Sequence, residues 1–337
     1  MENLTREKFT ATLEKIAKVN GVADPSKKFN VTPSIAQKMI DAIQLSSEFL
    51  KRINIQPVKE LEGEAIGLNQ GSTIAGRTNT KSGTPRKPVD PTGLESNTYK
   101  CAKTDFDVAL RYEKMDAWAR FPDFYAKWKA FVERAIALDM IMIGWHGTSV
   151  AVDTDRNANP LLQDLNIGWL EKIRTNAPSH HMKEVVAGSG KVVVGPTGDY
   201  KNLDAVVTDV VNNLISEIHQ DDTDLVVICG RQLLNDKNFP LVNNSKDNQD
   251  TLAGQILLSQ KQIGSLPAVR VPFFPDNAFL VTSFDNLSIY FQETGKRRKV
   301  IDNASLDQVE EYQSSNDAYV IETYDKVAFV ENIVIQE

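Results

Sequence analysis

The amino-acid sequence predicts an α+β fold, in which helices and strands of one chain pack into shared cores. Three observations predict it. Residues 124–145 repeat apolar side chains at helical spacing for six turns. Helical and strand-like segments alternate between residues 199 and 282, and the last fifty residues consist of strand-like segments and turns.

The N-terminal sixty residues predict two helices and a strand. A helix is expected over 5–19, where Phe9, Leu13 and Ile16 lie on one stripe, and Gly21 and Pro25 end it. An extended stretch then begins at 27–30. A second helix is expected over 32–50, with Pro33 in its first turn, and a strand over 53–58.

The next segment, 69–98, holds only four strictly apolar residues in thirty positions and is rich in glycine and proline. It cannot build a core of its own, because ordering each residue costs about 1–2 kcal/mol. Two interpretations stay open: a floppy linker, or a long β-hairpin arm ordered by lying on a neighbouring subunit. Strand-like flanks at 64–68 and 99–112 favour the arm.

The clearest helix covers 124–145 and is about 33 Å long at 1.5 Å per residue. Its main stripe is Phe124, Trp128, Phe131, Ala135, Leu138, Met142 and Trp145, and its second partial face is Val132, Ile136 and Ile143. Pro122 and Asp123 begin it, and Gly144 and Gly147 end it. A helix of this length can serve as a spine against a sheet.

The rest of the chain predicts an α/β unit followed by strands. Helices are expected over 161–176, 203–218, 231–236 and 251–263, and strands over 191–195, 224–230, 266–274, 278–282, 287–292, 299–301, 307–313, 317–322 and 328–335.

Composition excludes several classes. No run of about 18 apolar residues exists, and the first twenty residues lack the apolar region of a secretory signal, so we expect a protein made in the cytosol that has no membrane span. Cys101 and Cys229 are too few for a disulfide framework and are expected to be buried free thiols. The net charge of −7 does not fit a protein that grips DNA.

A search for chemistry finds no catalytic, cofactor or metal site. The fragment 188–191, GSGK, lacks the other residues of a phosphate-binding loop and is expected to be a turn between strands. His180 and His181 are adjacent and are expected on a surface loop. The acid pairs 221–222 and 310–311 are expected on solvated faces. We therefore expect no enzyme and no cofactor.

The strongest charge feature is the basic run Lys296, Arg297, Arg298 and Lys299. Three interpretations stay open: contact with DNA phosphates, pairing with acidic groups of a neighbouring subunit, or a solvated turn.

Several long stretches resemble the major capsid protein of peduovirus-type temperate tailed bacteriophages. They are SKKFNVTPS (26–34), FLKRINIQPV (49–58), LLQDLNIGWLEKIR (161–174), DLVVICGRQLL (224–234), LSQKQIGSLPAVRVPFFP (258–275) and NLSIYFQ (286–292). The resemblance runs from about residue 9 to the last strand.

The resemblance implies the Hong Kong 97-type capsid fold. By order along the chain, it implies an N-terminal arm at 30–60, an extended loop at 61–100, a peripheral domain at 101–195 and 300–337 that contains the spine helix, and an axial domain at 196–299. It favours the arm interpretation of 69–98.

The resemblance also implies a function. Such proteins assemble as hexamers and pentamers around an internal scaffold, with a portal protein, into an icosahedral shell that matures as it fills with double-stranded DNA. The expected location is the virion, and the host cytoplasm during assembly. Relatives are trimmed by a phage protease, which implies a cut near Phe29 and Asn30 that removes 1–29.

Two other functions stay open. One is an α/β enzyme or small-molecule binder centred on 196–282, although no motif supports it. The other is a scaffold or portal component of the same particle, against which the mixed sheet pattern argues.

Overall fold

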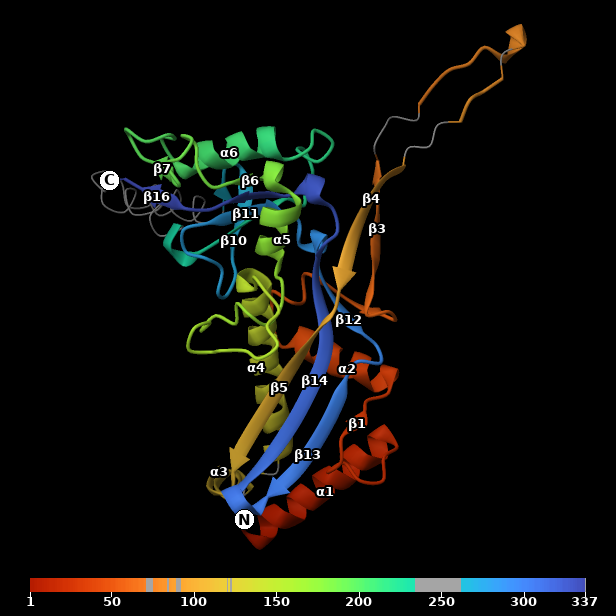
Figure 1. Cartoon of the computed structure of the whole chain (residues 1–337), viewed down its shortest axis with the longest axis vertical. Helices are drawn as coiled ribbons and strands as arrows, with labels where there is room; N and C mark the ends of the chain where they lie inside the picture. The colour runs from red at the N-terminus through yellow and green to blue at the C-terminus, as the bar shows by residue number, and fades with distance from the viewer. Residues whose placement is uncertain are drawn as a thin grey trace, which may run out of the picture.

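The computed structural model describes residues 1–70, 75–83, 85–88, 92–119, 121, 123–233 and 262–336. They form an elongated body with one sheet in each half and a hairpin arm that projects from one side (Figure 1). The predicted α+β class is confirmed. The predicted helix 251–263 and the end of the helix 231–236 lie largely outside the described residues.

The lower half of the body in Figure 1 is a six-stranded sheet centred on β14 (Gln308–Ile321). One edge of β14 pairs with β5 (Ala102–Arg111). The other edge pairs first with β13 (Arg297–Asn303) and then with β12 (Leu287–Gln292). Two further strands extend this sheet: β2 (Asn54–Val58) lies parallel to β12, and β1 (Phe29–Asn30) lies antiparallel to β13.

The prediction of two strands at 307–313 and 317–322 is wrong, because β14 is one continuous strand. The polar residues between the two predicted strands are paired with β5, and two of them, Ser314 and Ser315, are buried. The Ser315 hydroxyl donates to the buried Asp317 carboxylate at 2.5 Å. Polar sequence in the middle of a strand therefore marks buried polar contacts here and not a turn.

Helix α4 (Phe124–His146) crosses the back of this sheet (Figure 1), as the spine prediction requires. Both predicted stripes contribute to its buried face, since Trp145 of the main stripe is buried as well. Val132, Ile136 and Ile143 are buried against the sheet, whereas Phe131 of the predicted main stripe is 61% exposed. The Tyr319 hydroxyl of β14 donates to the Met140 carbonyl at 2.9 Å, which fixes the helix on the sheet.

Gly144 does not end α4, which continues to His146. Instead it provides space for Trp169 at the start of α5 (Trp169–Asn176), since a Cβ at position 144 would overlap the indole ring. Trp169 is fully buried, and its indole N–H donates to the Ser288 carbonyl at 3.0 Å. The glycine thus lets two helices meet closely over the sheet.

The upper half of the body is built on a second six-stranded sheet, in the order β6–β15–β11–β8–β10–β9. Its strands are β6 (His181–Met182), β15 (Ala328–Val330), β11 (Phe279–Thr282), β8 (Val226–Cys229), β10 (Leu266–Arg270) and β9 (Gln262–Ile263). Helix α6 (Leu203–Leu214) buries Val206, Val207 and Val210 against it. Two short strands, β7 (Val192–Val194) and β16 (Ile333–Ile335), pair beside it.

Three helices are shorter than predicted. α5 begins at Trp169 and not at 161, because residues 161–168 form turns in which Leu162 adopts a positive φ of 61°. α6 ends at Leu214, since Ile215 turns into the core in an extended conformation. α2 (Pro33–Leu45) ends five residues early, where the Gln44 amide caps the turn by donating to the Leu50 carbonyl.

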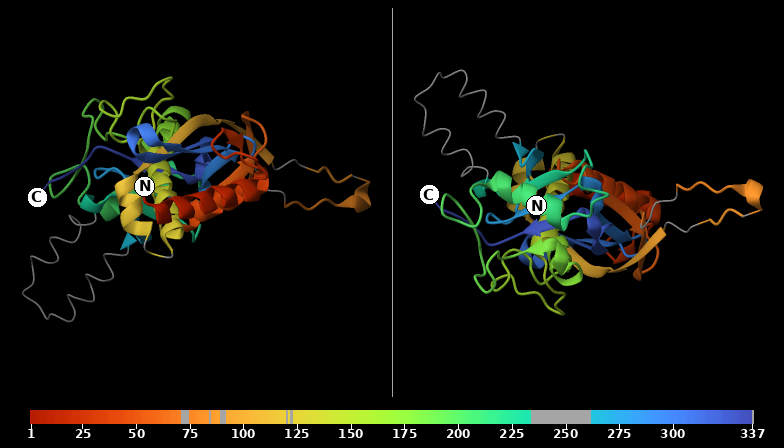
Figure 2. Two further views of the ribbon diagram at one scale, coloured as in Figure 1. Left: turned by 90° about the horizontal axis from the view of Figure 1, so that it is seen from below. Right: turned by 90° about the horizontal axis from the view of Figure 1, so that it is seen from above.

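The arm is a β-hairpin of β3 (Glu62–Gln70) and β4 (Thr92–Lys100), paired from Glu62↔Lys100 to Gln70↔Thr92. Its described tip, 75–83 and 85–88, is exposed at every position whose burial is described and includes one 3₁₀ turn, Thr80–Ser82. Both end views show the tip far from the body, on the side away from the C-terminal strands (Figure 2). The pairing confirms the predicted β-hairpin, and contact of the arm with a neighbouring subunit stays a prediction.

Candidate functional site: the N-terminal segment and the basic run

The fold brings the two candidate sites of the sequence together. Strand β1 lies on the edge of β13, with Phe29 opposite Arg298 and Asn30 opposite Arg297. The expected trimming position and the basic run are therefore neighbouring strands of one sheet. No spacing in the sequence indicated this contact, since the two segments lie more than 260 residues apart.

The chain reaches β1 through a defined turn. Gly21 ends α1 (Asn3–Asn20) with a positive φ of 65°, a conformation that favours glycine. The Asp24 carboxylate then accepts from the Ser26 N–H at 3.0 Å and from its hydroxyl at 2.6 Å. After β1, Pro33 in the first turn of α2 starts the next helix.

Backbone hydrogen bonds hold this segment at both ends. The Val300 N–H donates to the Pro25 carbonyl, and the Val31 N–H donates to the Lys296 carbonyl, each at 3.0 Å. Pro25 and Val31 are buried, whereas the side chains between them are exposed at Lys27, Lys28 and Asn30. The segment thus presents its side chains to solvent while its backbone is bound to the sheet.

Helix α1 covers the sheet beside this segment. Its Phe9 and Ile16 are buried in a small cluster with Leu110, Val300 and Val309, and Phe29 packs on the same cluster. Two cavities of about 380 and 210 Å³ lie beneath the helix, and α1, α4 and the sheet line both of them. The interface between α1 and the body is therefore apolar but incompletely filled.

The basic run is not a solvated turn as a whole. Lys296 is 5% exposed, and burial lowers the pKa of its ammonium to about 8 although Asp317 raises it. Arg298 forms an ion pair with Glu311 at 2.6 Å, and the Lys299 ammonium lies 5.6 Å from the centre of the Tyr312 ring. Lys296 and Arg298, two of the four cations, therefore make their contacts within the subunit.

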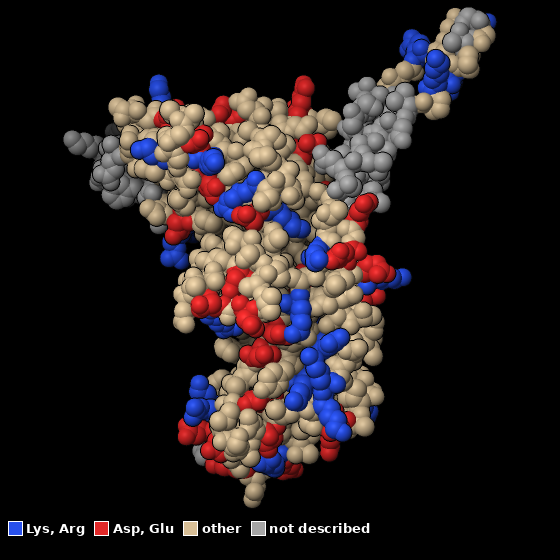
Figure 3. All heavy atoms as spheres, viewed as in Figure 1, with Lys and Arg blue, Asp and Glu red and all other residues tan. Residues whose placement is uncertain are grey.

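The outward-facing members of the run help to line a hollow of about 300 Å³ on the open face of the sheet, with Lys28, Lys103, Arg297, Lys299, Asp105 and Asp107 in its wall. Figure 3 shows Lys and Arg side chains gathered on this face of the lower body. Lys103 pairs with Asp105 at 2.6 Å, so part of the positive charge is compensated locally.

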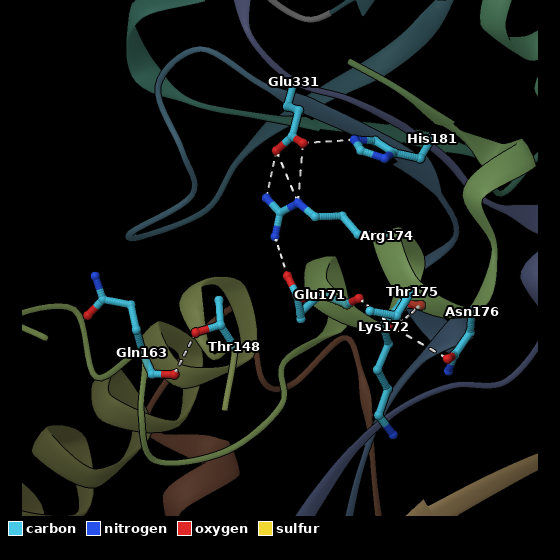
Figure 4. Close-up of polar contacts among 9 residues, drawn as sticks. All are labelled: Thr148, Gln163, Glu171, Lys172, Arg174, Thr175, Asn176, His181 and Glu331. Atoms are coloured by element: carbon cyan, nitrogen blue, oxygen red, sulfur yellow. Dashed lines mark hydrogen bonds and ion pairs between the residues drawn. The ribbon is translucent and has the colours of Figure 1, made fainter. Parts of the chain in front are cut away.

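A second polar cluster joins the two halves of the body, and sequence analysis missed it. Glu331, just after β15, accepts two or more hydrogen bonds from Arg174 of α5, the shortest at 2.6 Å, and binds His181 of β6 at 2.9 Å (Figure 4). Burial alone would raise the pKa of Glu331, but hydrogen bonds and charge from His181 and Arg174 outweigh it and lower that pKa to about 2.

Several expectations about surface groups are wrong. The His181 side chain is 9% exposed and stacks on Phe329, so it does not lie on a free surface loop. His180 is 17% exposed. The pair 310–311 lies within β14, where Glu310 is buried and Glu311 binds Arg298. The residues that bury these side chains are distant from them in the sequence. Local composition therefore could not predict that the side chains would be covered.

Two other expectations, on the cysteines and on the fragment 188–191, are confirmed. Cys101 and Cys229 are buried free thiols, and burial, with Asp317 nearby, raises the pKa of the Cys101 thiol to about 12. The fragment 188–191 is an exposed turn before β7, with positive φ at Gly188 and Gly190. Within the described part of the chain, no cluster of metal-binding side chains occurs and no helix has the length and apolar character to cross a membrane.

The chain is similar to known proteins over its whole length. Residues 8–333 match the family described as "Phage major capsid protein, P2 family". The chain is 46% identical over 342 residues to "Capsid proteins" of Escherichia phage P2, covering 99% of this chain and 96% of that protein. It is 39% identical to the "Major capsid protein" of Serratia phage KSP20, covering 100% of this chain and 99% of that protein.

Solved structures agree. The chain is similar to a chain of the "Satellite phage P4 procapsid including size determination (Sid) protein", with a TM-score of 0.82, 44% identity and coverage of 100% and 99% of the two chains. A capsid chain of an empty GTA particle shares the fold at a TM-score of 0.53 and 13% identity, covering 86% of this chain and 90% of that chain.

Proposed function

The chain belongs to the P2 family of phage major capsid proteins, and we propose that it builds an icosahedral head shell from hexamers and pentamers of itself around packaged double-stranded DNA. It is a phage major capsid protein with the Hong Kong 97-type fold, and its place is the virion. The observation that carries the proposal is the match to a procapsid chain along the full length. Assembly in the host cytoplasm, an internal scaffold and protease, and a portal protein complete the proposal.

The structural role leaves the enzyme alternative without support. Residues 196–282 contain α6 and four of the six strands of the second sheet, β8, β9, β10 and β11, and the described part of that region contributes to an apolar core. We propose the division into an N-terminal arm at 30–60, an extended loop at 61–100, a peripheral domain at 101–195 and 300–337, and an axial domain at 196–299. Pairing of β12 with β14 and of β15 with β11 ties the last two together across these boundaries.

Electron microscopy of the expressed chain tests assembly directly. We expect closed shells, tubes or capsomer rings, with or without a co-expressed scaffold. A compact monomer that persists at high concentration, even with scaffold present, contradicts the proposal.

We further propose that the arm acts by charge. Its tip carries Arg77, Lys81, Arg86 and Lys87 and no acidic residue between 75 and 88, and all four cations are exposed. The rest of the chain therefore carries −11, which is the whole-chain charge of −7 less these four positive charges. The tip is positively charged and the body is negatively charged. This difference favours contact of the tip with the body of a second copy of the chain over contact with another exposed loop of the same chain.

Neutralising the tip tests this contact. The fourfold variant Arg77→Gln, Lys81→Gln, Arg86→Gln and Lys87→Gln should assemble poorly and lose the salt dependence of assembly. The matched control changes four exposed body lysines, Lys59, Lys183, Lys191 and Lys201, to Gln. Equal loss in both variants would mean that net charge, and not the arm, matters.

We propose that residues 1–29 are removed on maturation, with the cut near Phe29 and Asn30. This segment has six Lys or Arg and four Asp or Glu, a net +2, so the mature subunit would carry −9. Exposure of Lys27, Lys28 and Asn30 beside the proposed cut supports the position. Mass spectrometry of purified mature particles should find subunits that begin near residue 30; intact subunits would contradict the proposal.

A further inference from the structure

The side chains of the trimming segment are accessible to a protease, but its backbone is not free to enter a protease active site. Its side chains at Lys27, Lys28 and Asn30 are exposed, yet its backbone is hydrogen-bonded to β13 at Pro25, along β1 and at Val31. A protease must draw several residues on each side of the scissile bond into its cleft as a free extended chain. Cleavage here therefore requires the segment to leave the sheet edge first, and its rate follows the population of that open state.

Opening of this segment is coupled to α1. The helix, the turn after Gly21 and β1 form one continuous stretch, and Phe29 packs on the same apolar cluster as Phe9 and Ile16. While these side chains hold α1 on the sheet, β1 is kept in register with Arg297 and Arg298. When α1 lifts, β1 loses the packing of Phe29 and keeps only its edge hydrogen bonds.

The α1 interface is suited to opening without unfolding of the body. It includes two partly open hollows, and the buried apolar side chains of α1 belong to a small cluster beside the main core, with Trp128 packed on both clusters. Hollows mean that fewer contacts are lost when the helix leaves. Elements released at low cost are the ones that proteins use as local switches.

We propose that α1 and β1 form a latch: the chain is cut near Phe29 only after α1 lifts off the sheet, so whatever displaces α1 during assembly determines when trimming occurs. The latch deepens the trimming proposed above and rests on it for its biological purpose. Its physical content, that α1 packing controls access to the segment, is testable without the phage protease.

Limited digestion of the full-length, unassembled chain by trypsin provides the test, because Lys28 lies within the latch. Arg77 and Lys81 in the exposed arm tip serve as internal references on the same molecule. We expect cleavage after Lys28 to be at least tenfold slower than cleavage at the tip. Comparable rates at the two places would overturn the latch.

Variants of α1 test the coupling. Phe9→Ala with Ile16→Ala truncates two buried apolar side chains of α1. The rate of cleavage after Lys28 should then rise at least tenfold, while the rate of cleavage at the arm tip stays constant. The matched control is Leu4→Ala with Val19→Ala, two residues of the same helix that are 47% and 51% exposed, and it should leave both rates unchanged. No acceleration in the first variant, or equal acceleration in the control, refutes the coupling.

A reversible disulfide tests the latch without any substitution in α1, so its result does not depend on correct folding of the α1 variants. Asn30→Cys with Arg297→Cys places two thiols directly opposite each other on antiparallel strands, a distance that a disulfide can span. The oxidised form should resist cleavage after Lys28 at least tenfold more than the reduced form of the same protein, with equal tip rates. Equal cleavage of both forms overturns the latch. If mature particles hold intact subunits, the trimming proposal fails, while these tryptic ratios still decide the latch.

Discussion

Replacing Glu331 by Gln should destabilise the subunit strongly at neutral pH and by only about 1 kcal/mol near pH 2.5. The carboxylate is 18% exposed and binds both Arg174 and His181, from α5 and β6, which belong to different parts of the body. Gln keeps the shape and one acceptor but removes the charge. Arg174 would then keep its 3.0 Å ion pair with Glu171 and its position over the Phe329 ring, but it would lose the ion pair with residue 331.

The size of the effect follows from the pKa of Glu331. Its environment lowers that pKa from 4.5 to about 2, and each pKa unit corresponds to about 1.4 kcal/mol. The ionised form therefore contributes about 3 kcal/mol to the free energy of unfolding. Because the folded-state pKa is depressed, this contribution is present above about pH 4.5 and is lost as the pH falls through about 2.

Urea unfolding of the unassembled chain measures this contribution to the free energy of unfolding, with the fluorescence of the buried Trp145 and Trp169 as the signal. The free-energy gap between wild type and Glu331→Gln should be about 3 kcal/mol at pH 7 and should fall to about 1 kcal/mol at pH 2.5, where a folded-state carboxylate with a pKa of about 2 is still mostly ionised. The control is Asp224→Asn, which breaks the contact of a 51% exposed carboxylate with Lys326 and should cost less than about 1 kcal/mol. A gap below about 0.5 kcal/mol at pH 7, or one that is as large at pH 2.5 as at pH 7, would refute the reasoning.

Three further predictions concern packing and exposure. Gly144→Ala should cost about 1–3 kcal/mol in unfolding free energy because its methyl group meets the Trp169 ring, whereas Gly76→Ala, in open space, should cost under about 0.5 kcal/mol by the same assay. An aromatic disulfide reagent should titrate no thiol in the native chain and two in denaturant, because Cys101 and Cys229 are buried; a reactive native thiol would contradict this. Phe131→Gln should leave the unfolding free energy within about 0.5 kcal/mol but reduce the yield of shells, as counted by electron microscopy.

Local patterns in the sequence were sufficient to predict most of the helices and strands. Apolar spacing identified the helix at 124–146 and the strand at 287–292, and turn residues identified the break after Asn20. These features depend on neighbours within one or two turns of the chain. The composition of 69–98 left a linker and a hairpin arm open, and the strand-like flanks of the segment indicated the β-hairpin.

Contacts between distant segments could not be predicted in this way. Glu331 meets Arg174 across 157 residues, and β1 meets β13 across more than 260. Polar residues such as His181 and Glu311 look solvated when only their neighbours in sequence are considered. Each side chain is at most 11% exposed because the fold brings a polar partner to it, Glu331 to His181 and Arg298 to Glu311, and that partner offsets the desolvation cost.

The α4 stripe shows what apolar periodicity measures. The repeat through Trp128 and Phe131 is as regular as the one through Val132 and Ile136, and both repeats contribute to the core at Trp145 and Ile136, yet Phe131 is 61% exposed. A regular apolar stripe indicates that a surface is covered in the functional state, and it does not distinguish cover by the same chain from cover by another. In a capsid protein the second source of cover is a neighbouring subunit. The exposed part of the stripe, at Phe131, is therefore the part of the spine helix where contacts between subunits are to be sought first.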